Sequence, residues 1–326
     1  MFSYIIRRLL LIIPALFIVS ILVFFLVRFI PGDVVDAMAT RATISGGLDR
    51  ATIEKVLGLD QPLLIQYGRW MGFLPQESGE FSGVIQGDLG NSMWSGSSVK
   101  LIVLSRLPVS LELGFLGIIF ALVIAIPIGV ISAVLQDSFP DYLSRSFAMI
   151  LISVPNFWIG TLVIVFPAIW WDYMGPIRYF PFLINPLENL RMTIVPALIL
   201  GMTMSGIIMR MTRTMLLEVL RQDYIRTARS KGLKERKVII RHALKNAFIP
   251  IVTIVGRLIP VLIGGAVVIE VLFSLPGMGR LLYDSITSRD YTLVTGIVLI
   301  LGIGVMFLNL LVDLTYAYLD PRIRYK

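Results

Sequence analysis

The chain has 326 residues, of which 56% are hydrophobic and only 15% are charged. So few charges cannot cover a soluble surface of this size, and we expect lipid to be the main solvent of the chain. The net charge of +8 fits membrane orientation better than nucleic-acid binding, because no soluble domain is left to carry an exposed basic face. The sequence contains no cysteine, which excludes disulfides, thiolate metal sites and thiol nucleophiles.

Six stretches of about 20 residues are long and apolar enough to cross a bilayer as helices. They are residues 9–27, 113–136, 146–171, 192–209, 246–269 and 291–312. The first is too long for the core of a signal peptide and no cleavage site follows it, so we expect it to remain as a span. A backbone in lipid must satisfy its own hydrogen bonds, and no barrel-like alternation is visible. The sequence therefore predicts an all-α polytopic membrane protein.

Lys and Arg gather in alternate loops, and this bias predicts the orientation, because short basic loops are retained in the cytoplasm. Both termini, the loop after the second span and the segment between the fourth and fifth spans are then cytoplasmic. The predicted parts are residues 1–30 with the first span, an extracytoplasmic segment 31–107 packed on the bundle, a core of five spans at 108–318, and a cytoplasmic tail at 319–326.

The basic insert, residues 210–245, contains eleven Lys or Arg against three acids. Apolar positions recur with helical spacing as far as Ala228, and Gly232 is placed to end this helix with a positive φ. A second helical stretch begins at about Glu235 and runs into the fifth span. Such a jointed element could be gripped by a soluble protein. A basic loop held against anionic lipid is the alternative, which composition alone favours.

Arg257 is the one charged residue inside a predicted span. A cation at the centre of a bilayer costs ~2.5 to 3.5 kcal/mol by insertion scales, so we expect it to face a wet cavity. There it could contact a substrate carboxylate or act as a gate. A structural pair with a carbonyl or an acid of a neighbouring helix is the alternative.

No catalytic motif accompanies these spans. The P-loop, the Gly-x-Ser-x-Gly elbow and the His-Glu-x-x-His zinc helix are absent from the sequence. The chain is therefore not expected to be an enzyme, and its energy must come from a partner or from an ion gradient. Gradient-driven carriers usually place ionisable groups in the membrane, and the predicted spans offer almost none.

The insert resembles the cytoplasmic loop of ABC-importer permeases, in which a Glu-Ala-Ala pattern precedes a glycine. Gly232 and Ala228 fit that pattern, whereas Arg226 and Thr227 depart from it. The run Arg-Thr-Ala-Arg-x-Lys-Gly-Leu, followed by Arg-His-Ala-Leu-x-Asn-Ala, is similar to the dipeptide, oligopeptide and nickel branch of these permeases. Further similar stretches follow in the same order along the chain, at 31–33, 57–62, 87–90, 106–108, 155–158, 264–270, 276–279, 289–290 and 320–322.

This resemblance implies a type I ABC-importer permease in a bacterial or archaeal cytoplasmic membrane. Its partners would be a second related permease, two ATPase subunits and an extracytoplasmic substrate-binding protein, with no nucleic acid. No cofactor is expected on this chain, because ATP and Mg²⁺ would bind to the ATPases. The residues implied in ATPase coupling are Asp223, Arg226, Thr227, Ala228, Arg229, Lys231 and Gly232.

Within this coupling helix, Thr227 and Ala228 would face the ATPase, while Arg226, Arg229 and Lys231 would orient it through charge. Candidates for the translocation path or its gate are Arg257, Asn156 and Trp158.

The function implied is peptide import. Members of this branch for nickel chelates, glutathione or sugars are alternatives. Two readings from other classes also stay open, namely a gradient-driven carrier that acts alone and a membrane-anchored structural or sensor protein.

Overall fold

The computed structural model describes residues 2–28, 60–176 and 178–319. The start of the extracytoplasmic segment, including the motif at 31–33 and the first half of that at 57–62, lies outside these residues, as does most of the tail. Within the described part the regular elements are helices, and one isolated bridge joins Asn91 to Ser98. The predicted all-α class is confirmed.

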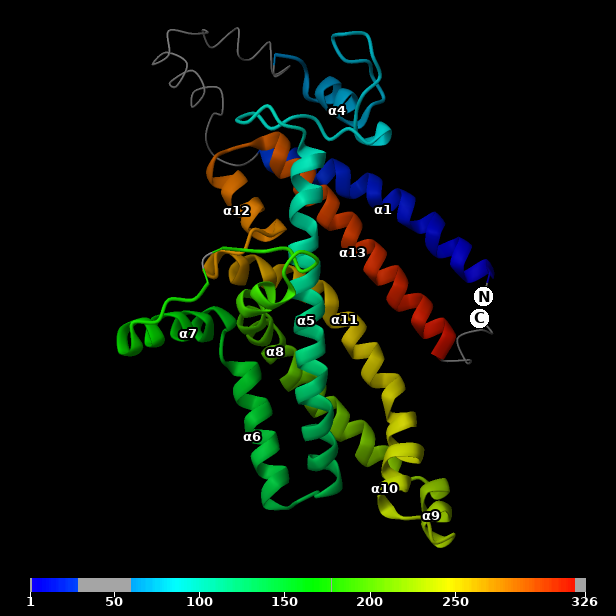
Figure 1. Ribbon diagram of the computed structural model, residues 1–326. Coiled ribbons are helices and arrows are strands. Elements are labelled where there is room, and N and C mark those ends of the chain that lie inside the picture. The colour runs from blue at the N-terminus through cyan, green and yellow to red at the C-terminus, as the bar shows by residue number, and fades with distance from the viewer. Residues whose placement is uncertain (1, 29–59, 177, 320–326) are drawn as a thin grey trace. The chain divides into compact units, whose positions relative to one another are not determined.

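The chain order of the elements is shown in Figure 1. They are α1 (Phe2–Arg28), α4 (Leu63–Met71), the 3₁₀ turn η1 (Val84–Gln86), α5 (Val99–Val134), α6 (Phe139–Ser153), α7 (Asn156–Trp171), α8 (Pro186–Leu220), α9 (Asp223–Ser230), α10 (Glu235–Lys237), the π-helix η2 (Val238–Leu244), α11 (Lys245–Leu272), α12 (Met278–Thr287) and α13 (Tyr291–Leu319).

Four of the described helical stretches are long and apolar enough to cross a membrane, and a fifth is added if a bent pair counts as one span. The four are Val99–Val134, Pro186–Leu220, Glu235–Pro260 and Tyr291–Val312. A shorter apolar stretch, Leu10–Phe25, lies within α1. This confirms a multi-span helical membrane protein.

The predicted third span, residues 146–171, is not one straight helix. α6 and α7 are bent by 91° at the break between them. Val154 there has an extended backbone, with φ −86° and ψ 123°. Pro155 follows it, and a proline disfavours helical geometry in the residue before it and cannot donate a backbone hydrogen bond. The break therefore follows directly from the Val-Pro pair.

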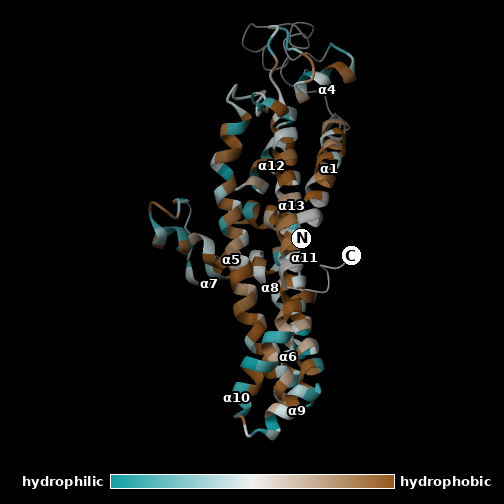
Figure 2. Cartoon of the chain, turned by 90° about the vertical axis from the view of Figure 1, so that its right-hand side faces the viewer, coloured by the Kyte–Doolittle hydropathy of each residue, from teal (hydrophilic) through white to brown (hydrophobic). Residues whose placement is uncertain are grey.

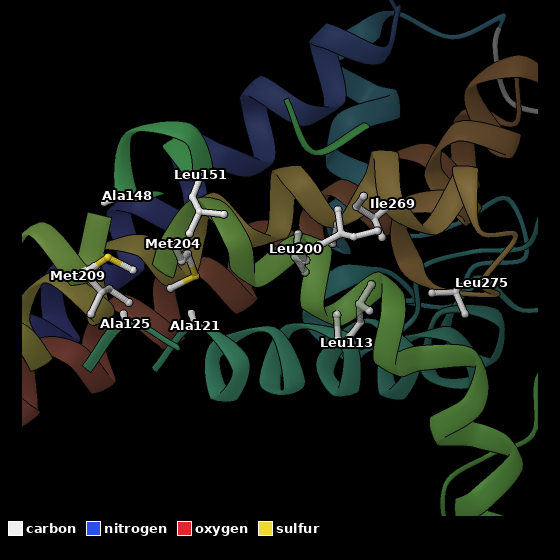
Figure 3. Packing of buried hydrophobic residues seen from close by; sticks show 14 of the residues in the cluster. Leu113, Ala121, Ala125, Ala148, Leu151, Leu200, Met204, Met209, Ile269 and Leu275 are labelled. Carbon is white, nitrogen blue, oxygen red and sulfur yellow. The ribbon is translucent and has the colours of Figure 1, made fainter. Parts of the chain in front are cut away.

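The chain forms two compact units, one of residues 1–5, 108–280 and 305–326, and one of residues 6–107 and 281–304. In the first unit α8 packs against α6, α7 and α11 and lies close to α5, and the buried side chains of these helices make one apolar core (Figure 3). Leu200, Met204 and Met209 of α8 lie in this core. α8 is therefore the central helix of the unit.

Small residues bring α5 and α8 close together. A Cβ atom added at Gly201 of α8 would lie 2.4 Å from the carbonyl oxygen of Gly117 on α5. One added at Gly129 of α5 would lie 2.7 Å from the Cβ of Thr212 on α8. Backbones can approach this closely only where no side chain stands between them. The backbones of α5 and α8 are therefore in close contact at two levels, one at Gly117 and Gly201 and one at Gly129 and Thr212.

A buried carboxylate joins three elements of the same unit. Glu270 of α11 accepts hydrogen bonds from the Ser110 hydroxyl of α5, at 2.5 Å, and from the backbone N–H groups of Gly279 and Arg280, at 2.7 and 3.1 Å. The first turn of a helix has free N–H groups and a positive dipole end, so a carboxylate there is stabilising. Glu270 thus fixes the start of α12 against α5.

In the second unit, aromatic side chains join α1 to α4. Phe24 packs edge-on against Tyr67 and contacts Trp70, while the hydroxyls of Ser20 and Tyr67 lie 2.8 Å apart. The segment before α5 is held separately, because the hydroxyl of Ser92 donates to the Asp290 carboxylate. This part of the unit is therefore ordered by polar contacts with the start of α13.

Candidate coupling site

The basic insert begins as the last turns of α8 and then breaks. α8 ends at Leu220, Gln222 is extended with φ −73° and ψ 147°, and α9 starts at Asp223. The helical spacing that runs as far as Ala228 is therefore shared by two helices, the end of α8 and the whole of α9. Asp223 lies in the first turn of α9, where a carboxylate is stabilised by the helix dipole. A new helix can start there.

Gly232 ends the helical region, as the sequence predicts. Its φ is +73°, and its N–H donates to the carbonyl of Arg229 at 2.9 Å. A Cβ added here would meet nothing within 4 Å. The glycine is therefore required by the backbone conformation and not by a lack of space.

One side of α9 faces the chain itself. Ile225 and Ala228 are buried against Leu216 of α8 and Val238 of η2. The elbow cluster, as we name this group, consists of Ala133, Leu216, Ile225, Ala228, Val238, Ala243 and Ala247. It holds α9 against the ends of α5 and α8 and against the start of α11.

The burial of Ala228 corrects one expectation. The side chain was predicted to face an ATPase, yet it points into the elbow cluster, because it lies three residues after Ile225 and so shares its side of the helix. The other predicted coupling residues are exposed. These are Asp223, Arg226, Thr227, Arg229, Lys231 and Gly232. Hydrophilic residues gather on α9 and α10 (Figure 2).

An ion pair closes the turn between α9 and α10. Arg229 donates to Glu235 from Nε at 3.2 Å and from Nη2 at 2.6 Å. The hydrogen bond to this carboxylate is the main cause that raises the pKa of Arg229 above its usual value. Both side chains are about half exposed, so the pair contributes little to stability. Arg229 is thus engaged within the chain, whereas Arg226 and Lys231 make no ion pair in the described part.

Two of the three path candidates lie at the start of α7. Asn156 accepts a hydrogen bond at 2.8 Å from the Thr203 hydroxyl of α8, and Trp158 is exposed. α7 packs on α11, where a Cβ at Gly160 would lie 2.5 Å from the side chain of Leu272. The break after α6 therefore places Asn156 against the central helix and leaves Trp158 on the surface.

Arg257 lies on an open side of α11. Its side chain is exposed, and it has no ion pair or hydrogen bond among the described residues. Asn246, Gly264 and Val268 are exposed on the same side at helical spacing. No described contact joins Arg257 to Asn156 or Trp158. Contact of this side of α11 with lipid is unfavourable, because it carries an arginine and an asparagine. We therefore expect water or protein to cover it.

One polar site was missed by the sequence argument. Asp141 of α6 is fully buried and accepts from Arg213 of α8 at two points, 2.8 and 2.7 Å. Its other donors are the Ser132 hydroxyl and the Asp137 N–H. In the sequence these charges read as parts of two cytoplasmic loops. An aspartate just after an uncharged span was the available signal.

Comparisons with known proteins agree with this geometry. Residues 125–325 match the family described as "Binding-protein-dependent transport system inner membrane component". Residues 1–114 match the family described as "Binding-prot-dependent transport system membrane comp, N-term". Together the two matches extend over nearly the whole chain.

Two relatives align along their full length. The dipeptide transport system permease protein DppB of Escherichia coli (strain K12) is 39% identical over 349 aligned positions, which cover 100% of both chains. The oligopeptide transport system permease protein AppB of Bacillus subtilis (strain 168) is 37% identical over 328 positions, again covering 100% of both.

A solved structure described as the crystal structure of an amino acid ABC transporter with histidines shares the fold. The TM-score is 0.50 at 16% sequence identity, and the match covers 67% of this chain and 94% of that chain. The helical architecture, the two family matches and the full-length relatives agree. The chain therefore belongs to the family of binding-protein-dependent transport system inner membrane components, and it is an inner-membrane permease subunit of an ABC importer, without catalytic activity of its own and with ATP bound by partner ATPase subunits.

Proposed function

We propose that this permease forms half of the path by which di- and oligopeptides cross the cytoplasmic membrane. The observation that carries this is the full-length identity of 39% and 37% to permeases named for dipeptide and oligopeptide transport. The test is uptake by the reconstituted importer with its binding protein. Peptides of two to five residues are compared with a nickel chelate, glutathione and a disaccharide. Saturable uptake of one of the latter, without peptide uptake, would contradict the proposal.

The proposed topology has six spans, formed by α1, α5, the α6–α7 pair, α8, α11 and α13, with both termini in the cytoplasm. The basic insert supports this orientation. The core is proposed to extend over 108–318, with the extracytoplasmic segment 31–107 before it and the short tail 319–326 after it. Because the chain has no cysteine, single cysteines at Gln222 and Trp171 can be labelled by an impermeant maleimide. Labelling at Gln222 from outside intact cells would contradict the orientation.

The partners proposed are a second related permease, two ATPases and a substrate-binding protein outside the cell. α9 is the proposed docking element for one ATPase, with Thr227, Arg226 and Lys231 on its exposed side. Reversing both charges, Arg226→Glu with Lys231→Glu, should weaken ATPase binding about tenfold at low salt. Arg145→Glu, at an exposed cation of another predicted cytoplasmic segment, is the matched control. Equal ATPase affinity in all three proteins would remove α9 from the interface.

Ala228 is proposed to support coupling by holding α9 in position, because its side chain lies in the elbow cluster. A tryptophan there cannot fit in the elbow cluster and should displace α9, so binding-protein-stimulated ATP hydrolysis should fall to the basal rate. Phe139→Trp, at a side chain that is 78% exposed, is the control. Normal stimulation in the Ala228→Trp complex would show that the position of α9 does not matter.

Arg257 is proposed to contact the carboxylate end of a peptide, with Asn156 and Trp158 also on the path. Arg257→Met should raise the transport KM for free peptides about tenfold, since a hydrogen bond to a charged group is lost. The KM for C-terminally amidated peptides should stay the same. The KM of Arg257→Lys for free peptides should lie between those of the parent and of Arg257→Met. An unchanged KM for free peptides in the methionine variant would remove this role.

A further inference from the structure

The cytoplasmic ends of α5, α6 and α8 are joined by a buried ion pair that the docking element does not itself contain. Asp141 in the first turn of α6 is fully buried, and the side chain of Arg213 on α8 is 20% exposed. The guanidinium contacts both carboxylate oxygens, from Nε at 2.8 Å and Nη2 at 2.7 Å. A two-point contact of this kind fixes angle as well as distance. α6 cannot rotate against α8 without breaking it.

The same carboxylate also holds α5. The Ser132 hydroxyl donates to Asp141 at 2.6 Å, and the Asp137 N–H donates at 3.0 Å. Asp137 has a positive φ of 60°, a conformation that a residue other than glycine rarely adopts. The turn from α5 to α6 is thus folded around Asp141. Three elements meet at one buried group.

Direct packing adds to the pair. Gly129 of α5 faces Thr212 of α8, the residue before Arg213, so closely that a Cβ would come within 2.7 Å. The Thr212 hydroxyl is buried there without a hydrogen-bond partner in the described part. A buried hydroxyl without a hydrogen-bond partner destabilises the fold. The close packing of α5 on α8 is therefore present despite this unfavourable contribution. The contact between α5 and α8 at this level is tight.

The pair stands one helical turn from the elbow cluster. Leu216 follows Arg213 by three residues on α8 and is fully buried against Ile225 and Ala228 of α9. Ala133 of α5, next to Ser132, belongs to the same cluster. An unbroken series of packed groups therefore leads from α9 through the cluster to Asp141 and α6.

We propose that the Arg213–Asp141 pair, together with the elbow cluster, makes α9 and the cytoplasmic ends of α5, α6 and α8 one rigid body. Movement of α9 by the ATPases then turns α6 directly and reaches the break before α7, where Asn156 and Trp158 stand. Arg213 and Asp141 are positioning residues in this scheme, because neither touches ATP or peptide. The inference rests on the proposed docking of α9.

The first test measures coupling in the complete importer, reconstituted with both ATPases, the second permease and the binding protein. Arg213→Gln leaves the carboxylate without its ion partner, and Arg213→Lys keeps the charge but loses the two-point geometry. ATP hydrolysed per peptide transported should rise about tenfold in the glutamine variant and less in the lysine variant. Arg191→Gln removes an exposed pair with Glu188 on the same helix and should leave the ratio unchanged.

A merely structural role would give a different result. It would lower the yield of assembled complex, or reduce hydrolysis and transport in parallel, and leave ATP per peptide at the parent value. That outcome for Arg213→Gln overturns the proposal. Asp141→Asn covers the case in which the arginine variants fail to assemble, because its amide still fills the site and accepts one hydrogen bond.

The second test measures the rigidity itself. Spin labels are attached to cysteines at Leu143 on α6 and Gln222 before α9, both exposed, in the cysteine-free chain. In the parent importer the distance between the labels should be the same with and without trapped nucleotide. In Arg213→Gln it should broaden or shift when nucleotide is trapped. A parent distance that changes with nucleotide overturns the rigid body.

The outcomes separate the two proposals. If α9 does not dock an ATPase, charge reversal at Arg226 and Lys231 leaves ATPase binding unchanged, whatever the label distance does. If docking is right and the rigid body is wrong, that charge reversal weakens binding while the 143–222 distance moves in the parent.

Discussion

The amide nitrogen of Asn246 donates a 2.7 Å hydrogen bond to the phenol oxygen of Tyr224, which ties the start of α9 to the start of α11. The two residues lie on either side of the turn at Gly232, so their contact closes the base of the elbow that the basic insert forms. The elbow is therefore fixed at its base by this bond, at its turn by Arg229 and Glu235, and on its inner side by the elbow cluster.

Removing the Tyr224 hydroxyl should loosen the elbow slightly. Tyr224→Phe is expected to destabilise it by about 1 kcal/mol, the usual net contribution of one hydrogen bond. Binding-protein-stimulated hydrolysis should fall modestly, and thermal unfolding of the complex should begin at a lower temperature. Tyr142→Phe is the control, because the Tyr142 hydroxyl has no hydrogen bond in the described part. An equal effect of the two variants would contradict a role for the bond.

Gly232→Ala should be harmful although there is room for the methyl group. Alanine at a φ of +73° costs roughly 1 kcal/mol or slightly more. Because the cost is conformational, Gly232→Asn should be milder than Gly232→Ala. Gly175→Ala, which has open space and no positive φ, should be neutral. The measurement is the loss of ATP hydrolysis by the complex as the temperature is raised. Equal thermal stability of the Gly232→Ala and Gly175→Ala complexes would contradict the prediction.

Gly201→Ala should separate α5 from α8. The added Cβ would lie 2.4 Å from the Gly117 carbonyl oxygen, and overpacking of this kind costs about 1 to 3 kcal/mol. Gly114→Ala on α5, where nothing lies within 4 Å, is the matched control. Yield of assembled complex and its melting temperature are the readouts. Both variants melting alike would mean that the helices are not in contact at this level.

Tyr179 offers a test by pH. Burial is the main cause that raises its pKa to about 12, and the nearby Glu112 carboxylate adds to the rise. Stabilisation from the neutral phenol is then fully present below pH 10 and is lost as the pH rises through 12. In a difference titration of phenolate absorbance between the parent and Tyr179→Phe, the missing component should titrate above that of free tyrosine. A component with an ordinary midpoint would contradict the burial of this phenol.

Much of the helical framework could be predicted from the sequence, because length and hydrophobicity act locally. The apolar stretches locate α5, α8 and α13, and the positive φ at Gly232 follows from the type of residue and its place after a helical pattern. Pro155 accounts for where the break after α6 falls, although the sequence predicts one span over residues 146–171 and gives no sign of the 91° angle. A proline shows where a helix ends but not where the next one points.

Other features depend on parts of the chain that lie far apart in sequence. Asp141 and Arg213 are separated by 72 residues, and neither shows its partner by spacing. The side chain of Ala228 is buried because Leu216 and Val238, from two other elements, pack against it. The π-helix from Val238 to Leu244 carries no sequence signal that we recognise. These features come from tertiary packing, which local patterns do not contain.

The break between α6 and α7 limits what can surround the chain. The last carbonyl groups of one helix and the first N–H groups of the next have no partner within their own helices. Hydrocarbon offers such groups nothing, so a broken backbone is tolerated in a bilayer only against protein or water. In the proposed six-span topology, which places the break within the bilayer, the backbone at Val154 and Pro155 therefore faces protein or water.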